Sequence, residues 1–229
     1  MINQGDIIPY LQMCAIEGGV NLQQGMNFRL HGGHSIILMS LREDAPYADK
    51  VIDDGRTIIY EGHDVRRTQS DNPKSVNQPM KNPGGSLTSN GKFFESAQKY
   101  KDGECHPDPV RVYEKIKKGI WVYNGFFMLV DAWQEQSDGR QVFKFRLELA
   151  DDSSPTPNTK DLVHNRVIPA SVKYEVFMRD NGKCVKCGST DNLHYDHDLP
   201  YSKGGSSLVA ENIQILCARH NLQKSDKIE

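Results

Sequence analysis

The sequence has 229 residues, of which 25% are charged and 37% are hydrophobic, and its mean hydropathy is -0.62. This composition is typical of a soluble globular protein with one large or two small domains, and no apolar run approaches the roughly 18 residues of a membrane span. A formal net charge of -2 excludes a protein that coats nucleic acid by bulk positive charge, but not a reader with a local basic face. The first residues lack the basic and apolar regions of a secretory signal, so we expect a cytoplasmic, non-secreted protein without a membrane partner.

The first 150 residues indicate mainly β-structure. Apolar runs predict strands at 35–40, 57–60, 121–123, 126–130 and 142–149. Asn124-Gly125 separates two of these runs, and this dipeptide is the strongest short-range signal of a hairpin. One helix is predicted at 92–101. The pattern favours a curved sheet or barrel with few helices.

A long polar stretch runs from residue 63 to residue 92 and is rich in Asn, Pro, Gly and Ser. Long loops of this kind in compact domains are usually functional or disordered. The stretch carries five basic side chains: Arg66, Arg67, Lys74, Lys81 and Lys92.

The composition changes once, at 151–159, where two prolines stand among small polar residues and can continue neither a helix nor a central strand. We interpret this change as a domain boundary and predict a first domain at 1–152, a linker at 153–164 and a second domain at 165–229. The second domain is predicted to contain a helix at 171–180, strands at 193–196 and 213–216, and a last helix from residue 217.

Two pairs of metal-ligand residues stand in the second domain. Cys184 and Cys187 are separated by two residues, and so are Cys217 and His220. Each pair can present two ligands to one tetrahedral Zn²⁺ ion, which gives a Cys₃His site. Four protein ligands leave no open position for a substrate, so this zinc is expected to be structural. The alternative is a set of reduced cysteines that bind no metal.

Between and after these pairs lie residues suited to phosphodiester hydrolysis. His197 can act as the base that activates water, because the ordinary pKa of histidine lies near neutrality. Asp196 and Asn221 offer oxygen atoms to a hard cation on the scissile phosphate. The side chain of Asn212 stands at the end of a glycine-rich loop, which it can brace by hydrogen bonds.

This set of residues resembles the HNH endonuclease motif in its zinc-binding variant, over residues 171–227. The resemblance implies a small zinc-bound ββα-metal domain with His197 as the general base. It implies Asp196 and Asn221 as ligands of a catalytic Mg²⁺, Mn²⁺ or similar divalent ion, and Asn212 as the loop brace. The alternative is a zinc-ribbon binding module in which Asp196 and His197 have no catalytic role.

The first domain carries residues suited to a flat ring. The rings of Tyr47 and Tyr60 can stack on a base, and Asp49 can accept a hydrogen bond from cytosine N4. On these residues alone, tyrosines in the core or at its rim explain the pattern as well. In their order and surroundings, however, they resemble the SRA domain, a methylcytosine-flipping module. That resemblance implies that Tyr47 and Tyr60 sandwich the flipped base and Asp49 reads its edge.

The same resemblance covers roughly residues 20–155 and assigns the segment around Asn90 and Lys92 to DNA contact, where it fills the gap that the flipped base leaves. One departure is that the stretch from Tyr47 to Asp53 is one residue longer than the family pattern. It further implies an SRA-like (PUA-like) curved β-barrel or sheet for the first domain, and so an α+β protein of two domains.

Together the two resemblances predict an SRA-HNH modification-dependent restriction endonuclease of a prokaryote. Such an enzyme binds double-stranded DNA that contains 5-methylcytosine or 5-hydroxymethylcytosine and hydrolyses nearby phosphodiester bonds. One HNH site cuts one strand, so we expect a homodimer for double-strand cleavage. The alternatives are an HNH endonuclease that reads unmodified sequence and a catalytically inactive DNA-binding module.

Overall fold

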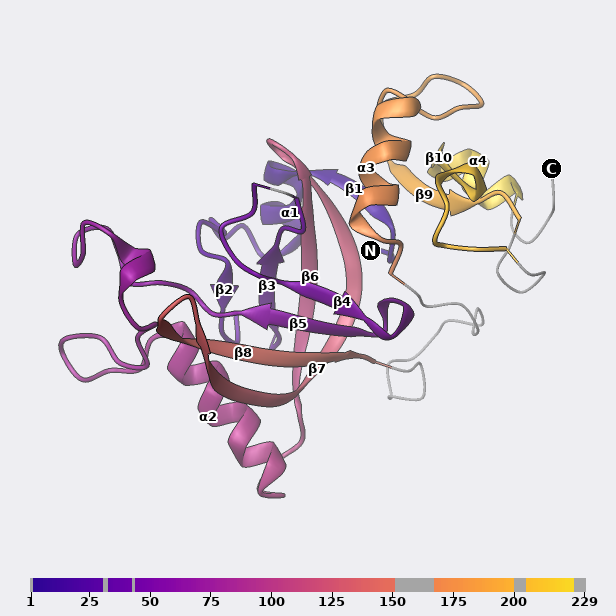
Figure 1. The fold of residues 1–229 in the computed structure, drawn as a ribbon. Helices are drawn as coiled ribbons and strands as arrows, with labels where there is room; N and C mark the ends of the chain where they lie inside the picture. Colours follow the sequence, from indigo (N-terminus) through magenta and orange to yellow (C-terminus); the bar gives the residue numbers. More distant parts are fainter. Residues whose placement is uncertain (1, 31–32, 43, 151–166, 200–204, 225–229) are drawn as a thin grey trace.

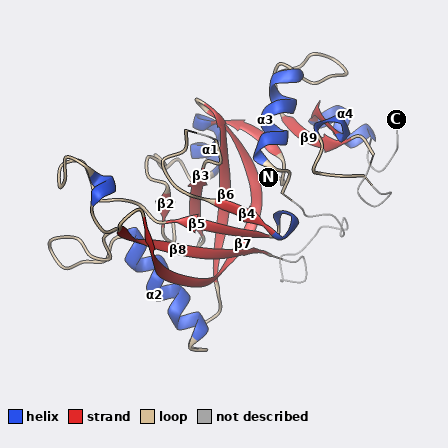
Figure 2. Ribbon diagram, viewed as in Figure 1, coloured by secondary structure: helices blue, strands red, loops and turns tan. Residues whose placement is uncertain are grey.

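The computed structural model describes residues 2–30, 33–42, 44–150, 167–199 and 205–224, and in these ranges a curved sheet is accompanied by loops and four α-helices (Figures 1 and 2). The strands are β1 (Asp6–Pro9), β2 (Met26–Asn27), β3 (Ser35–Met39), β4 (Lys50–Ile52), β5 (Thr57–Glu61), β6 (Asp108–Lys117), β7 (Ile120–Ser137), β8 (Arg140–Leu149), β9 (Leu193–His197) and β10 (Ile213–Cys217). The α-helices are α1 (Tyr10–Ile16), α2 (Ser89–Lys101), α3 (Ala170–Arg179) and α4 (Ala218–Lys224), and 3-10 turns lie at Asp53–Gly55, Pro73–Ser75 and Ala210–Asn212.

The sheet is organised around β7, which has 18 residues. The order along the main path is β10-β9-β1-β7-β6-β3-β2, and β8, β5 and β4 branch from β7 in turn. The first part of β7 lies between β1 and β6, and its later part pairs with β8. β3 runs parallel to β6, whereas the other described pairs are antiparallel. One strand with different neighbours along its length makes the sheet curl (Figure 1).

The predicted strands at 35–40, 57–60 and 142–149 correspond to β3, β5 and β8, and the helix predicted at 92–101 is α2. The helix begins earlier than predicted because Thr88 caps it. The side-chain oxygen of Thr88 accepts a hydrogen bond from the Gly91 N–H at 3.2 Å. This contact satisfies one of the free N–H groups of the first turn.

The hairpin predicted at Asn124-Gly125 is wrong, because β7 runs through both residues. Gly125 has a φ of +118°, and the register against β6 shifts between Val112 and Tyr113, opposite this point. A β-bulge and a tight turn both favour glycine for its access to positive φ, so the same dipeptide serves either. The turn between β7 and β8 instead uses Asp138-Gly139, where both φ values are positive.

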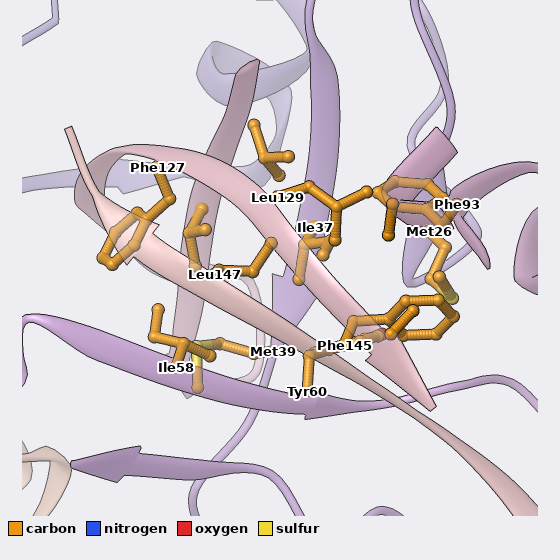
Figure 3. Close-up of a cluster of buried hydrophobic side chains, with 14 of the residues drawn as sticks. Met26, Ile37, Met39, Ile58, Tyr60, Phe93, Phe127, Leu129, Phe145 and Leu147 are labelled. Atoms are coloured by element: carbon orange, nitrogen blue, oxygen red, sulfur yellow. The ribbon is translucent and has the colours of Figure 1, made fainter. Parts of the chain in front are cut away.

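The first hydrophobic core lies inside the curl of the sheet (Figure 3). Its buried members come mainly from β2, β3, β5, β6, β7, β8 and α2, and they include Met26, Ile37, Ile58, Tyr60, Phe93, Phe127, Phe145 and Leu147. Phe93 of α2 packs edge-on against Phe145, with 5.8 Å between the ring centroids. The helix therefore closes this core from one end of the sheet.

A second core joins the predicted domains. Ile7, Ile116 and Val122 from the first domain are buried against the α3, β9 and β10 side chains of the second, including Val172, Val176, Phe177, Leu193, Tyr195, Ile213 and Ile215. In the same region β9 pairs with β1, with Ile7 opposite Leu193. The sheet is thus continuous between the two domains. The linker predicted at 153–164 lies outside the described residues.

Within the described ranges, none of the helices combines the length and the apolar character required for a membrane crossing.

Candidate functional site

The predicted nuclease residues come from a β-hairpin followed by a helix. β9 and β10 are antiparallel, with Asp196 opposite Gln214 and His197 opposite Ile213, and α4 follows β10 directly. Side chains alternate along a strand, so Asp196 and His197 point to opposite faces of the hairpin. The buried Tyr195 lies on the same face as His197 and packs in the second core.

His197 is held by a residue that the sequence reasoning missed. Its Nε2 lies 2.7 Å from the Oγ of Ser207, which is only 5% exposed. The Ser207 hydroxyl can accept a hydrogen bond from Nε2–H, and the tautomer that donates it has the imidazole lone pair on Nδ1. Ser207 follows the glycine-rich loop directly, but a serine in such a loop carries no signal that distinguishes it from a turn residue.

Asp196 pairs with a buried cation. The Nζ of Lys224 lies 2.6 Å from the Oδ2 of Asp196 and also donates to the backbone oxygen of His197. The side chain of Lys224 is 1% exposed. Burial raises the pKa of Asp196, although the hydrogen bond and the charge of Lys224 act in the opposite direction.

Asn212 and Asn221 lie at opposite ends of the hairpin's second strand. The side chain of Asn212 accepts from the Leu199 N–H at 2.8 Å and donates to the backbone oxygens of Leu199 and Ser206 at 3.1 and 3.0 Å. Asn212 therefore ties the two ends of the loop that follows β9. Asn221 lies on α4, three residues before Lys224, whose Nζ contacts Asp196.

The four predicted zinc ligands converge. Their sulfur and nitrogen atoms all lie within 4.8 Å of one another. The Sγ atoms of Cys184 and Cys217 lie 3.3 and 3.4 Å from Nδ1 of His220, and Cys187 Sγ lies 3.9 Å from Cys217 Sγ. A tetrahedron with Zn–S near 2.3 Å and Zn–N near 2.0 Å has S···S edges of about 3.8 Å and S···N edges of about 3.5 Å. The cluster therefore has the dimensions of a zinc site.

The chemistry of the cluster agrees with its geometry. Burial alone raises the pKa of the Cys184 thiol, but hydrogen bonds from backbone N–H groups, first that of Cys217, outweigh it and lower the pKa to about 6. Metal binding requires the thiolate, so these N–H groups prepare the ligand. Cys105 lies outside the cluster and is exposed.

In the first domain a cavity of about 510 Å³ contains the predicted base-reading residues Tyr47 and Asp49 in its wall. We call it the Asp49 cavity. Ser40, Glu61, Lys74 and Arg140 also line it. A wall of this kind offers one aromatic face and several hydrogen-bonding groups, as expected for a polar aromatic ligand.

The backbone of Glu61 holds the carboxyl group of Asp49 in place. Its Oδ1 accepts a hydrogen bond from the Glu61 N–H at 2.9 Å. Asp49 has a pKa of about 7, and the main cause is burial, which raises the pKa. The charge of Glu61 also raises it, whereas hydrogen bonds from the backbone N–H groups of Glu61 and Ser40 and the charge of Lys144 lower it. The carboxyl group therefore changes its protonation close to neutral pH.

Glu61 lies under the Asp49 cavity in a buried ion network. Its carboxylate contacts Lys144 Nζ at 2.9 Å and Arg140 Nη2 at 3.4 Å, and Arg140 Nη1 contacts Asp64 at 2.5 Å. The Lys144 and Arg140 side chains are each about 5% exposed or less. Since a buried charge is costly without a partner, these groups fix one another and hold the cavity floor.

Tyr47 borders the Asp49 cavity on one side and a second cavity on the other. Its hydroxyl oxygen accepts a hydrogen bond from the Asp64 N–H at 3.4 Å. The Nζ of Lys74 lies 4.1 Å from the centre of the Tyr47 ring and 3.0 Å from Asp64. One face of the ring is therefore covered by an ammonium group, which a stacked base on that face would have to displace.

Tyr60, predicted to sandwich the base with Tyr47, does not line either cavity. It is 2% exposed and belongs to the first core, and its hydroxyl lies close to Gly25. The physical reason is strand alternation: Tyr60 shares a face of β5 with Ile58, which is the core face, whereas Glu61 points to the cavity.

The second cavity, about 530 Å³, is lined by basic and polar side chains, and we call it the Lys92 cavity. Lys92, Lys81, Arg66 and His63 contribute to its wall. Lys92 is exposed there. The cavity therefore brings together Arg66, Lys81 and Lys92, three of the five basic residues of the long polar stretch.

Asn90 lies elsewhere than predicted. It is on α2 and fully buried. Its side chain accepts from the His63 N–H at 2.9 Å and donates to the backbone oxygens of His63 and Pro79 at 2.9 and 3.2 Å. A side chain enclosed in this way cannot enter DNA without unfolding the start of the helix, so Asn90 anchors the long loop instead. The exposed residues closest to that role are those of 81–86.

Two families of known proteins match parts of the chain. The SAD/SRA domain family matches residues 2–153, and the HNH endonuclease family matches residues 184–227. None of the curated proteins compared with the sequence matches it.

Among solved structures, the chain is similar to the SRA domain of SUVH5 in complex with hemimethylated CG DNA, with 26% identity, a TM-score of 0.45, and 71% of this chain and 94% of that chain covered. It is also similar to the SUVH5 SRA domain bound to fully hydroxymethylated CG DNA, with 25% identity, a TM-score of 0.45, and 71% and 95% covered. A third similar structure is the modification-dependent TagI restriction endonuclease, with 19% identity, a TM-score of 0.44, and 96% of this chain and 76% of that chain covered.

Because the first of the two family matches extends over more than half of the sequence, the chain belongs to the SAD/SRA domain family, and it carries a segment that matches the HNH endonuclease family near its C-terminal end.

Proposed function

We propose that this protein is a modification-dependent DNA endonuclease, which reads a flipped, modified cytosine in the Asp49 cavity and hydrolyses a nearby phosphodiester bond at His197. The observation that carries the proposal is the continuous sheet, which joins a SAD/SRA fold with a polar cavity to a hairpin that carries Asp196 and His197 beside a zinc-sized cluster. The proposal places the protein in the cytoplasm of a prokaryote, where it meets DNA directly.

Base reading would use Tyr47 and Asp49. Flipping a base costs a few kcal/mol, and stacking on an aromatic ring returns about 1–3 kcal/mol. The pairing edge of cytosine carries a donor at N4 beside an acceptor at N3. A protonated carboxyl group matches this edge because it accepts from N4 and donates to N3, and Asp49 titrates near pH 7. The phosphates on either side of the flipped base would lie against Lys92, Lys81 and Arg66 of the neighbouring cavity.

Hydrolysis would use His197 as the base that takes a proton from the attacking water. Ser207 fixes the orientation of the imidazole. Asp196 and Asn221 supply oxygen atoms of the kind that Mg²⁺ and Mn²⁺ prefer, and Lys224 shows that a positive charge is accommodated at Asp196. When bound, such an ion would neutralise charge on the scissile phosphate. The Cys₃His cluster would hold a structural Zn²⁺, whose four ligands leave no position for DNA.

The first prediction tests the hydrolytic site. His197→Ala should reduce cleavage of a plasmid that contains 5-methylcytosine by at least about 10²-fold, because proton transfer by a positioned base contributes about 10²–10⁴ to the rate. Binding of modified DNA should not change, since the base acts in the transition state. The control is His106→Ala, which removes an exposed histidine of the first domain. Cleavage by His197→Ala at the rate of the control would contradict the assignment.

The second prediction tests the zinc site. Cys184→Ala and Cys217→Ala should each lower the bound zinc from about one ion per chain to near zero, measured by elemental analysis, and should make residues 184–224 sensitive to protease. Structural zinc supplies roughly 10–16 kcal/mol of apparent binding energy in zinc-finger peptides. Cys105→Ala, which changes an exposed cysteine outside the cluster, should keep its zinc. Zinc at the wild-type level in both ligand variants would argue against the site.

The third prediction tests base reading and its pH dependence. Because burial raises the pKa of Asp49 to about 7, the group is mostly protonated at pH 6 and mostly ionised at pH 8. Affinity for 5-methylcytosine DNA should therefore fall by about tenfold from pH 6 to pH 8. Asp49→Asn, whose amide stays neutral, should show no such fall, and Tyr47→Ala should lose the preference for modified DNA at both pH values.

The measurement for this prediction is a fluorescence titration with modified and unmodified duplexes of the same sequence. Tyr174→Ala is the matched control because Tyr174 is exposed on α3, away from both cavities. If Tyr47→Ala kept the wild-type ratio of affinities for modified and unmodified duplexes, Tyr47 would not belong to the base site. If Asp49→Asn kept the wild-type pH dependence of affinity, Asp49 would not belong to it.

The fourth prediction concerns assembly. The chain has one pair of Asp196 and His197, and the two DNA strands are antiparallel, so cutting both strands requires a second site. Two-fold pairing of two copies is the commonest solution. We expect mainly nicked products from DNA with one modified site. Two suitably spaced modified sites should give double-strand breaks, at a rate that rises more steeply than linearly with enzyme concentration. Double-strand breaks at single sites with first-order kinetics would contradict assembly on the DNA.

A further inference from the structure

A buried lysine crosses from the second domain into the first. Lys173 lies on α3 with a side chain that is 2% exposed. Its Nζ donates to Glu114 Oε2 at 2.6 Å and to Asn124 Oδ1 at 2.5 Å, and Asn124 Nδ2 donates to the same Glu114 oxygen at 2.8 Å. These three groups form a closed triangle. An unpaired buried ammonium is very unfavourable, so α3 is stable on the sheet only where Glu114 and Asn124 meet it.

The pairing of β1 with β9 is a second contact that fixes the position of the second domain relative to the first. Asp6 stands opposite His194, and the two side chains form an ion pair or hydrogen bond. The Tyr195 N–H donates to the Gly5 oxygen at 3.1 Å, and the Tyr195 hydroxyl donates to the Lys173 oxygen at 2.6 Å. A slip of one residue in this ladder would turn every β9 side chain to the opposite face. The register therefore decides where Asp196 and His197 point.

The chain is also pinned where it enters the second domain. Val167 is buried in the first core, beside Gly55. Ile168, the next residue, is buried in the second core. The attachment of α3 to the first domain therefore begins directly before the helix.

We propose that these contacts hold the nuclease hairpin at one position relative to the Asp49 cavity, so that Lys173, Glu114 and Asn124 act as positioning residues that set the distance from the modified base to the cut. The inference rests on the proposed function and adds a geometric consequence to it. The second domain acts as an extension of the first domain's sheet. The fixed separation between the Asp49 cavity and the nuclease hairpin then sets how far from the modified base the enzyme cuts.

The competing arrangement is a nuclease on a tether, and the two differ in the spread of cut positions. A flexible tether of 12 residues, the length of the linker predicted at 153–164, would have a root-mean-square span of roughly 19 Å, or about six base pairs. Docked interfaces usually shift by less than about 1 Å, which is smaller than one base-pair step of 3.4 Å. Rigid docking therefore predicts a window of about one or two base pairs.

The experiment uses the full chain and a long duplex with a single 5-methylcytosine, labelled on each strand in turn, with cut positions read at nucleotide resolution. The central variant is the pair Asp6→Cys and His194→Cys. Directly opposed residues of antiparallel strands have Cα separations that suit a disulfide, so oxidation locks β9 onto β1. Asp6→Cys alone, treated with the same oxidant, is the matched control, and zinc content is measured in all samples.

The expected result is that the locked form cuts at the same positions as its reduced form and the wild type, at an unchanged rate. Loss of cutting in the locked form that is restored by reduction would show that the hairpin must leave β1 in order to act, and would overturn the proposal. A wild-type window as wide as the tether predicts would overturn it as well.

A second variant tests the triangle. Lys173→Ala leaves the Glu114 carboxylate without its cation and should widen or shift the window of cuts, while the affinity for modified DNA and the zinc content stay unchanged. A purely structural role would lower stability or activity without moving the cut positions, and that result would contradict the positioning role. Where Lys173→Ala fails to fold, the disulfide pair still decides between the two arrangements. Equal cleavage of unmodified DNA by the wild type would instead refute the proposed function itself.

Discussion

The long strand β7 is the element on which the other parts of the structure depend. Among the described strands, β7 alone pairs with all three of β1, β6 and β8, and so it connects the strands that lead to the β9–β10 hairpin with those that lead to the Asp49 cavity. The irregularity at Gly125 allows one strand to serve both, because a bulge bends the strand and increases its twist. The residue before it, Asn124, points into the interior and meets Lys173 there. The irregularity at Gly125 therefore contributes to the bend of β7 and lies next to the contact between Asn124 and Lys173.

Buried carboxylates recur at the points where the fold must be precise. Glu61 is paired with Lys144 and Arg140 below the Asp49 cavity, Glu114 with Lys173 between the domains, and Glu17 with Arg111 and Tyr113 near α1. Buried ion pairs contribute little net stability compared with apolar groups of the same volume, since desolvation offsets the attraction. Their directional bonds, however, penalise every arrangement in which one partner is left unpaired. In this protein they therefore serve geometry more than stability, at the cavity and at the domain junction alike.

The sequence predicted those parts of the structure that depend on neighbours in the chain. The zinc cluster and the Asp196-His197 strand lie within about 40 residues, so spacing alone identified them. The resemblance to the SRA domain assigns Tyr60 to the base sandwich, whereas strand alternation does not say which face of β5 is the core, and the structure places Tyr60 in the core. The same resemblance assigns the segment around Asn90 to DNA contact, whereas the buried anchoring role of Asn90 depends on His63, which is 27 residues away. Lys173, Glu114 and Asp6 gave no signal, because charged residues of this kind are usually solvated and their partners are distant in sequence.

The energetics of base reading explain why the position of the nuclease matters for selectivity. Burying one methyl group is worth about 0.8 kcal/mol, or only about fourfold in affinity, so a methyl pocket by itself discriminates weakly. A flexible nuclease would cut whenever chance brought it to DNA, and it would inherit only that fourfold preference. A hairpin fixed on the reader's sheet reaches the backbone productively only when the flipped base is fully seated, since reacting groups displaced by 1 Å can lose about 10² in rate. Small differences in how fully a modified and an unmodified cytosine enter the Asp49 cavity are then converted into differences in the rate of cutting. Selectivity in cleavage therefore exceeds the selectivity that the cavity supplies in binding alone.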